Sequence, residues 1–87
     1  MEKNLSIINN SFKELPNNIE AEQSVIGSIL LSNEIFDEIN TIISNKNFYD
    51  PMHQKIFLAI ESLIYKGMLA NPITLKNHFK NEKDEIN

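Results

Sequence analysis

The 87-residue sequence contains neither cysteine nor arginine, and both absences limit what the chain can do. Without cysteine it has no disulfide framework and no thiolate metal site. Without arginine it has no planar guanidinium fork for binding phosphate or guanine, and no arginine finger. All eight basic residues are lysines, and twelve acidic residues bring the net charge to −4. This acidic balance opposes nucleic-acid binding by the chain alone.

Long apolar segments are absent as well. No run approaches the ~18 apolar residues of a membrane-spanning helix, and residues 1–15 lack the sustained apolar core of a secretory signal. We therefore expect a cytoplasmic protein with no membrane partner. Alternating β-branched runs bounded by hairpin turns, which indicate strands, are also missing.

What remains is a series of amphipathic helical patterns. The length allows one small domain, which needs either very good helix packing or neighbours to be stable, and we favour neighbours. We expect a flexible arm over residues 1–15, a helical domain over 16–81, and a charged tail over 82–87 that leads to a missing downstream region. The predicted fold is all-α, a small orthogonal bundle of about four main helices.

Cap residues and apolar spacing predict the first two helices. The first is expected over residues 18–31, because an asparagine suits the N-cap and acidic residues follow in the first turn. Small residues on this helix, Gly27 among them, would allow another helix to pack close. The second helix is expected to start at Ser32 or Asn33 and to end near residue 43, with one apolar face.

The third and fourth helices also have recognisable starts. Asp50 suits an N-cap and Pro51 suits the first helical position, while a glycine just past the end is a stop signal. We expect the third helix to bury one face, made of Met52, Ile56, Phe57, Ile60, Leu63 and Ile64. After a loop that Pro72 ends, Thr74 is expected to cap a shorter helix through about Asn81, and the charged tail either continues that helix or frays.

Histidines and carboxylates are the candidates for chemistry. Asp50 and His53 have the spacing of half a metal site, but we favour a helix cap followed by a partly exposed histidine. We expect His78 to lack an acidic partner at helical spacing, and two ligands do not complete a zinc shell. The sequence therefore predicts no metal site in this chain.

Carboxylates on the first two helices would form an acid–base pair only if they converged in a cleft. Their places in first turns and on expected solvent faces instead predict roles in helix-dipole stabilisation and solubility; they are Glu20, Glu22, Glu34, Asp37 and Glu38. A P-loop with its Lys-Ser or Lys-Thr pair is absent. We expect no catalytic residue and no cofactor in this chain.

Phe48 and Tyr49 begin an informative cluster that continues through Asp50, Pro51 and His53. These five residues are our candidates for an interface with a partner protein, since tyrosine combines apolar area with a polar tip. In the alternative, structural interpretation, Phe48 plugs the end of the bundle and Tyr49 covers a helix end. We favour the core position for Phe48 and leave both interpretations of Tyr49 open.

Several segments together resemble one known family. Residues 15–31, reading LPNNIEAEQSVIGSILL, closely resemble the opening helix of the N-terminal domain of the bacterial replicative DNA helicase, the DnaB family. The segment FYDPMHQKIF looks like the second signature of that family. The segments Tyr65–Gly67 and Pro72–Leu75 are similar to its next helix end and helix start. The resemblance covers residues 15–79.

The resemblance implies a homohexameric, ATP-driven helicase that unwinds DNA at the replication fork. It implies N-terminal domains that form a collar on the motor ring and contact primase and other replisome proteins. ATP and magnesium would belong to the motor domain, and DNA contact to the parent protein. Neither that motor nor the helical hairpin that usually follows is in this sequence, so we interpret Asn87 as a truncation point.

The sequence thus predicts a helical scaffold for assembly and partner binding. One alternative is a free-standing adaptor protein that binds a helicase or its partners. A stop codon after Asn87 would favour the adaptor, and a downstream P-loop would favour the fragment. The other alternative is a small DNA-binding helical domain, which the acidic charge disfavours.

Overall fold

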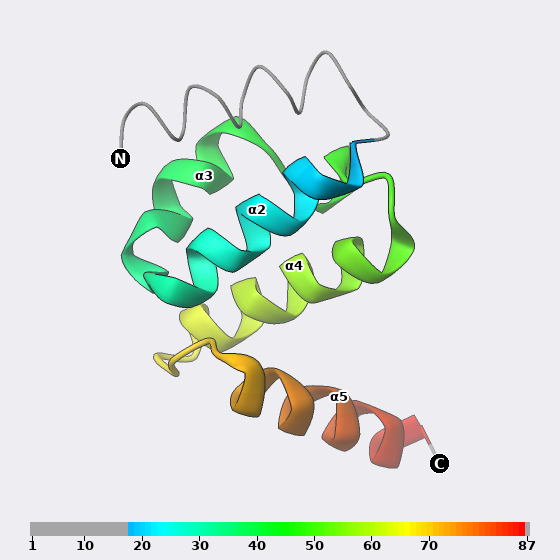
Figure 1. Ribbon diagram of the computed structural model, residues 1–87. Helices are drawn as coiled ribbons and strands as arrows, with labels where there is room; N and C mark the ends of the chain where they lie inside the picture. Colours follow the sequence, from blue (N-terminus) through cyan, green and yellow to red (C-terminus); the bar gives the residue numbers. More distant parts are fainter. Residues whose placement is uncertain (1–17, 87) are drawn as a thin grey trace.

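The computed structural model describes residues 18–86, with side chains for residues 18–82. These residues form an all-α bundle of four helices and two short 3₁₀ turns, with no strand among them (Figure 1). The predicted fold class is therefore confirmed. The expected flexible arm, residues 1–15, lies outside the described residues. No helix in the described part is long and apolar enough to cross a membrane.

The first described helix, α2, spans Ile19–Leu31 and starts where the sequence predicts. Asn18 caps it, because its Oδ1 accepts the backbone N–H of Ala21 at 2.9 Å. No described residue makes the close contact at Gly27 that the small residues of this helix would allow. A Cβ atom built at Gly27 has no heavy atom of the described residues within 4 Å, so none of those residues packs against this side of α2.

The second helix begins with a 3₁₀ turn, Asn33–Ile35, which leads directly into α3, Phe36–Ile42. Ser32 occupies the cap position but makes no side-chain cap bond. The Asn33 amide bonds the carbonyl oxygens of Ile29 and Ala70 instead. The predicted Ser32 or Asn33 cap is therefore wrong in its chemistry, because the Asn33 side chain holds two distant segments together.

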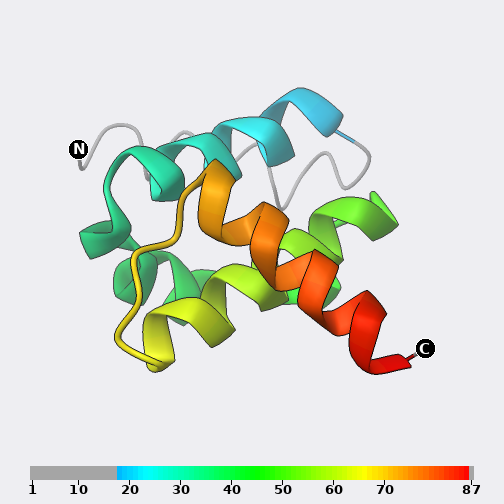
Figure 2. The same cartoon turned by 90° about the horizontal axis from the view of Figure 1, so that it is seen from below.

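Helix α4, Pro51–Tyr65, contacts α2, α5 and the second 3₁₀ turn, Asn45–Asn47, and so occupies the centre of the bundle (Figure 2). Asp50 caps it as predicted, with its Oδ1 accepting the Met52 N–H at 2.8 Å. The predicted buried face needs one correction. Met52 is exposed, and His53 takes the buried position in the first turn.

Helix α5 spans Pro72–Ile86, so it starts before and ends after the predicted bounds. Asn71 caps it, with its Oδ1 accepting the N–H groups of Ile73 and Thr74 at 2.9 Å each. The contact between Asn71 and Thr74 is reciprocal, since the Thr74 Oγ1 also accepts the Asn71 N–H at 2.9 Å. The predicted Thr74 cap is therefore wrong. Of the two alternatives for the charged tail, the structure shows that the tail continues the helix, as far as Ile86.

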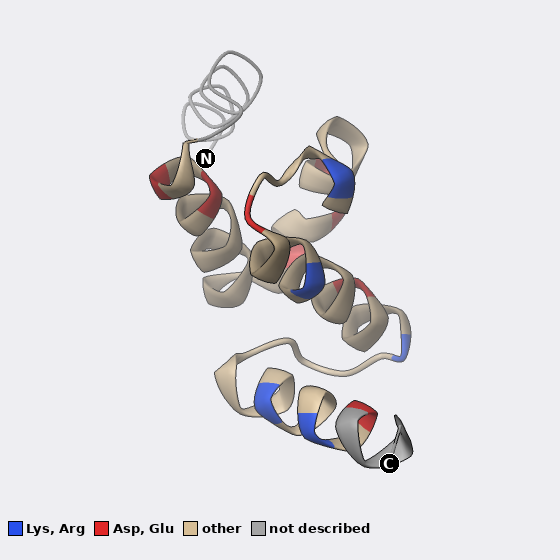
Figure 3. Cartoon of the chain, turned by 90° about the vertical axis from the view of Figure 1, so that its right-hand side faces the viewer, with Lys and Arg blue, Asp and Glu red and all other residues tan. Residues whose placement is uncertain are grey.

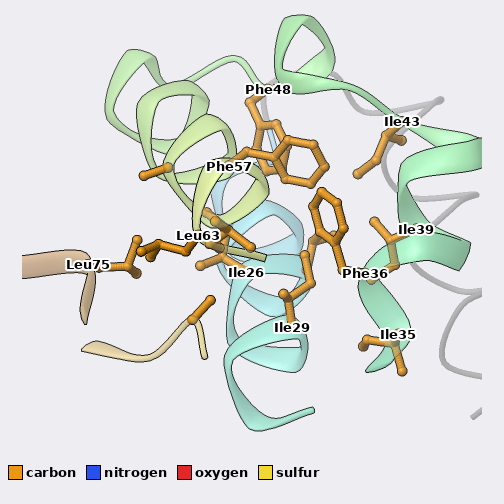
Figure 4. Close-up of a cluster of buried hydrophobic side chains, with 14 residues drawn as sticks. Ile26, Ile29, Ile35, Phe36, Ile39, Ile43, Phe48, Phe57, Leu63 and Leu75 are labelled. Carbon is orange, nitrogen blue, oxygen red and sulfur yellow. The ribbon is translucent and has the colours of Figure 1, made fainter. Parts of the chain in front are cut away.

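Three phenylalanines form the centre of the core. The Phe57 ring lies between those of Phe36 and Phe48, with centroid distances of 5.4 and 5.2 Å (Figure 4). The predicted core position of Phe48 is confirmed, because it is 2% exposed. Around the three rings lie buried aliphatic side chains, among them Val25, Ile29, Ile39, Ile60 and Leu63.

Candidate partner interface

Glu22 belongs to the face of α2 that packs into the core, together with Val25, Ile26 and Ile29. It is only 2% exposed. The expectation that Glu22 has a solvent-facing role is therefore wrong. A carboxylate at this depth destabilises the fold unless polar groups compensate it.

Three donors surround the Glu22 carboxylate. Its Oε2 accepts the backbone N–H of Tyr49 at 2.7 Å, and its Oε1 accepts that of Asp50 at 3.2 Å. The same Oε1 lies 2.8 Å from Nδ1 of His53. An ionised carboxylate only accepts, so Nδ1 of His53 carries the proton in this contact. Hydrogen bonds to a charged acceptor are about twice as strong as neutral ones, so the buried charge is compensated.

A second contact fixes the same segment. The Gln54 side-chain amide donates to the carbonyl oxygen of Phe48 at 2.6 Å. Asp50, whose own N–H binds Glu22, also caps α4. The backbone from Phe48 to Asp50 is thus held by side chains of α2 and α4 at the point where it enters α4. A segment fixed in this way loses less conformational entropy when a partner binds it.

The fixed segment presents apolar side chains to solvent. Tyr49 is 60% exposed and Met52 is 55% exposed, with exposed Pro51 between them. We call Tyr49, Pro51 and Met52 the entry surface, because they surround the start of α4. Tyrosine and methionine are enriched in the cores of protein interfaces.

The structure divides the five predicted interface residues. Tyr49 and Pro51 are exposed and Asp50 is half-buried, whereas Phe48 and His53 are buried. The buried pair supports the surface from below and offers no side chain to a partner. Met52, which completes the entry surface, was not among the candidates, because helical spacing alone assigned it to the core.

His53 is not the partly exposed histidine that the sequence suggested. It is 9% exposed, and its ring packs edge-on to the Phe48 ring with centroids 6.3 Å apart. Its Nδ1 is directed to Glu22, while the Asp50 Oδ1 is occupied by the cap of α4. Asp50 and His53 therefore have separate structural roles and do not share a ligand.

His78 has an acidic partner after all. Its Nε2 lies 3.3 Å from Oε2 of Glu82, one turn further along α5, so the contrary expectation is wrong. Among the described residues there is no group of three or more His, Cys, Asp or Glu that could hold a metal ion.

Charges are unevenly distributed over the bundle (Figure 3). Residues 18–45 contain no lysine, and four of their carboxylates are exposed: Glu20, Glu34, Asp37 and Glu38. Within the described residues the first lysine is Lys46, and further lysines follow along α4 and α5. The buried Glu22 is the carboxylate of α2 that binds the backbone of another segment.

Comparison with known proteins shows which proteins this chain resembles in sequence. The model of the DnaB-like helicase N terminal domain matches residues 14–87. The replicative DNA helicase DnaB of Rickettsia typhi is 41% identical over 80 residues, which cover 85% of this chain and 16% of that protein. That of Buchnera aphidicola subsp. Baizongia pistaciae is 45% identical over 62 residues, covering 71% and 13% of the two chains.

A more distant relative matches over a similar share of each chain. The replicative DNA helicase DnaB of Treponema pallidum is 32% identical over 65 residues, covering 75% of this chain and 15% of that protein. The chain thus spans about a sixth or less of the length of these curated relatives. No solved structure was found to match it.

Proposed function

Because this chain belongs to the family of DnaB-like helicase N-terminal domains, we propose that it is a protein-docking domain acting in DNA replication. Its role would be to take part in the assembly of a hexameric replicative helicase and to receive primase or another replisome protein. The observation that carries the proposal is the family match over residues 14–87. The helicase relatives support its connection to replication.

The proposed mechanism is geometric. Glu22 and Gln54 fix the backbone at the start of α4, so the entry surface is presented in one conformation. A partner then binds a surface that is already ordered. Tyr49 is the expected centre of that contact, since tyrosine is enriched among the residues that dominate binding energies.

The remaining chemistry of a replicative helicase would belong to other parts of a whole protein. This sequence contains no Lys-Ser or Lys-Thr pair to end a P-loop, so ATP and magnesium would be bound elsewhere. Because the net charge of this chain is −4, we assign DNA contact to the whole helicase and not to this chain alone. Such a protein would act in the cytoplasm.

Binding to a purified primase tests the proposal. The primase of Rickettsia typhi, the source of one relative, is a suitable probe, measured by fluorescence anisotropy with the labelled 87-residue chain. We expect Tyr49→Ala to weaken binding about ten- to thirty-fold. Tyr65→Ala is the matched control, because Tyr65 is an exposed tyrosine at the opposite end of α4.

Two results would contradict the proposal. One is an unmodified chain that does not bind the primase. The other is an equal loss of affinity in the Tyr49→Ala and Tyr65→Ala chains, which would exclude the entry surface as the contact. Circular dichroism of both variants verifies that the helices are intact.

A further inference from the structure

Exposed side chains continue the entry surface along α4. Pro51, Lys55 and Leu58 follow one another at spacings of four and three residues, so they lie on one face of the helix. Lys55 is exposed, and Leu58 is 46% exposed. We call the entry surface together with Lys55 and Leu58 the extended surface. Its apolar residues thus lie on both sides of one lysine.

Lys55 has no acidic partner within this surface. The residues three or four positions away from it in α4 are Pro51, Met52, Leu58 and Ala59, none of which is acidic. The ion pairs of the described residues do not include Lys55. The preceding carboxylate, Asp50, is engaged in the cap of α4.

The neighbouring 3₁₀ turn adds charge of the same sign. The turn Asn45–Asn47 contacts α4 and carries Lys46, which is exposed. Lys46 also takes no part in an ion pair of the described residues. The extended surface is therefore apolar with a positive charge inside it and another on a segment that contacts α4.

This arrangement restricts the chemistry of the partner. A partner that covers Met52 and Leu58 also covers the side chain of Lys55 between them and takes water away from its ammonium group. Removing water from an unpaired charge disfavours binding, and a carboxylate of the partner compensates for it. The matching surface is therefore apolar on both sides of an acidic residue.

An amphipathic helix has such a surface. Side chains three, four and seven residues apart lie on one face of a helix, so two apolar residues can stand one turn before and one turn after an acidic one. Such a helix packs its side chains between those of α4. The acidic, half-buried Glu61 follows Leu58 by three residues and disfavours an acidic partner beyond that point. Tyr65 therefore lies outside the contact.

We propose that the extended surface binds an amphipathic helix of a replisome partner, and that the apolar face of this helix carries a carboxylate opposite Lys55. The inference rests on the proposed function and names the chemistry of the partner. It assigns Lys55 a role in selecting the partner, whereas Tyr49 supplies most of the contact area.

Substitutions of Lys55 test the inference in the primase binding assay. Lys55→Met keeps an unbranched side chain but removes the charge, and should weaken binding about three- to tenfold, because the opposing carboxylate loses its partner. Lys55→Glu should weaken it about tenfold or more, because two like charges then meet. Lys55→Arg should retain most of the affinity. A purely apolar partner would instead bind the Lys55→Met chain more tightly.

The matched control is Lys76→Met, because Lys76 is an exposed lysine on α5, outside the extended surface. It makes the same change in net charge and should leave the affinity nearly unaltered. Added salt should weaken primase binding less in the Lys55→Met chain than in the unmodified chain, because one screened charge pair is gone.

Two synthetic peptides test the same chemistry without primase. Both form one designed amphipathic helix, with either glutamate or glutamine one turn from a leucine on each side. NMR titration follows the amide signals of Lys55 and Leu58. We expect the glutamate peptide to bind about three- to tenfold more tightly than the glutamine peptide. This difference should disappear in the Lys55→Met chain.

The inference is overturned if the Lys55→Met chain binds primase as tightly as the unmodified chain or more tightly. It is also overturned if the two peptides bind equally, or if neither binds at about 1 mM. Its failure is distinct from that of the proposed function. A Tyr49→Ala chain that binds primase weakly beside a Lys55→Met chain that binds normally would contradict only the acidic partner. If primase does not bind the unmodified chain, the proposed function fails, and the peptides still decide the chemistry of the surface.

Discussion

The Oε1 atom of Glu22 and the Nδ1 atom of His53 lie 2.8 Å apart inside the bundle, and they connect the first turns of α2 and α4. The two residues are 31 positions apart in the sequence. Because the same carboxylate also binds the backbone of Tyr49 and Asp50, one side chain fixes how the chain enters α4. The order of the entry surface depends on this contact.

Replacing Glu22 is therefore expected to be costly. Glu22→Ala leaves two part-buried backbone donors and a buried imidazole without their acceptor, and should lower the free energy of unfolding by about 3–5 kcal/mol. Glu22→Gln keeps one acceptor oxygen and should cost about 1–3 kcal/mol. Urea unfolding followed by circular dichroism measures both values.

The control for Glu22 is Glu20→Ala, in the same turn but exposed. A surface change of this kind should cost about 0.5 kcal/mol or less. If Glu22→Ala were as mild as Glu20→Ala, the hydrogen bonds from Glu22 to the entry segment would not contribute to stability.

A second prediction concerns the coupling between Glu22 and His53. His53→Leu keeps an apolar body beside Phe48 but removes the Nδ1 donor, and should cost about 1–3 kcal/mol. The Glu22→Gln, His53→Leu double variant should lose less than the sum of the single losses, with a coupling of about 1–3 kcal/mol. Additive losses in the unfolding free energies would mean that the two side chains act independently.

Helical spacing in the sequence indicates that Glu22 and His53 are buried, although their polar side chains led us to expect exposure. Glu22 precedes Val25 and Ile26 by three and four residues, and His53 precedes Phe57 by four. Both polar residues therefore continue an apolar helix face toward its first turn. Helical spacing places each one in the core. The identity of the partner depends on how the helices pack, which no local pattern gives.

Asn33 is the subject of the third prediction. Its amide bonds Ile29 and both backbone groups of Ala70, a fully buried residue. Asn33→Ala leaves the Ala70 N–H without its acceptor and should lower the unfolding free energy by about 1–3 kcal/mol. Hydrogen exchange of the Ala70 amide, followed by NMR, should become faster as the loop loosens.

Asn77→Ala is the matched control for Asn33→Ala, because Asn77 is an exposed asparagine inside α5. Alanine favours helix more than asparagine does, so this change should be neutral or slightly stabilising. An Ala70 amide that exchanges equally fast in both variants would contradict the role assigned to Asn33.

The starts of α4 and α5 show why one helix-start signal was recognised and another was missed. Asp50-Pro51 and Asn71-Pro72 are the same signal, a capping side chain followed by proline at the first helical position. The sequence interpretation applied it to α4 but chose Thr74 as the cap of α5. The Thr74 hydroxyl instead accepts from Asn71 within the cap, and such a reciprocal contact is visible only in the structure.

The fourth prediction tests the aromatic core. Phe57 is 1% exposed between the rings of Phe36 and Phe48, so Phe57→Ala should cost about 3–5 kcal/mol. That loss is enough to unfold a domain of this size at ambient temperature. The neighbouring Leu58→Ala, at an exposed position, should change the melting temperature far less. Equal melting temperatures would show that α4 is rotated relative to the structure described.

The last prediction uses the two glycines, for which the same substitution should have opposite effects. Gly67 ends α4 with a φ of 78°, and its N–H binds the Ile64 carbonyl oxygen while that of Met68 binds Leu63. This is the geometry of a Schellman cap, which favours glycine. Gly27 lies inside α2 with helical backbone, and a Cβ atom added there has no heavy atom of the described residues within 4 Å.

Gly67→Ala should therefore destabilise the chain by about 1–2 kcal/mol, because an L side chain is strained at positive φ even where nothing contacts it. Gly27→Ala should stabilise it by about 0.5–1 kcal/mol, because alanine loses less entropy in a helix. Thermal unfolding followed by circular dichroism should show melting temperatures on opposite sides of the parent value. A lower melting temperature for Gly27→Ala would reveal that a segment outside the described residues packs against the Gly27 side of α2.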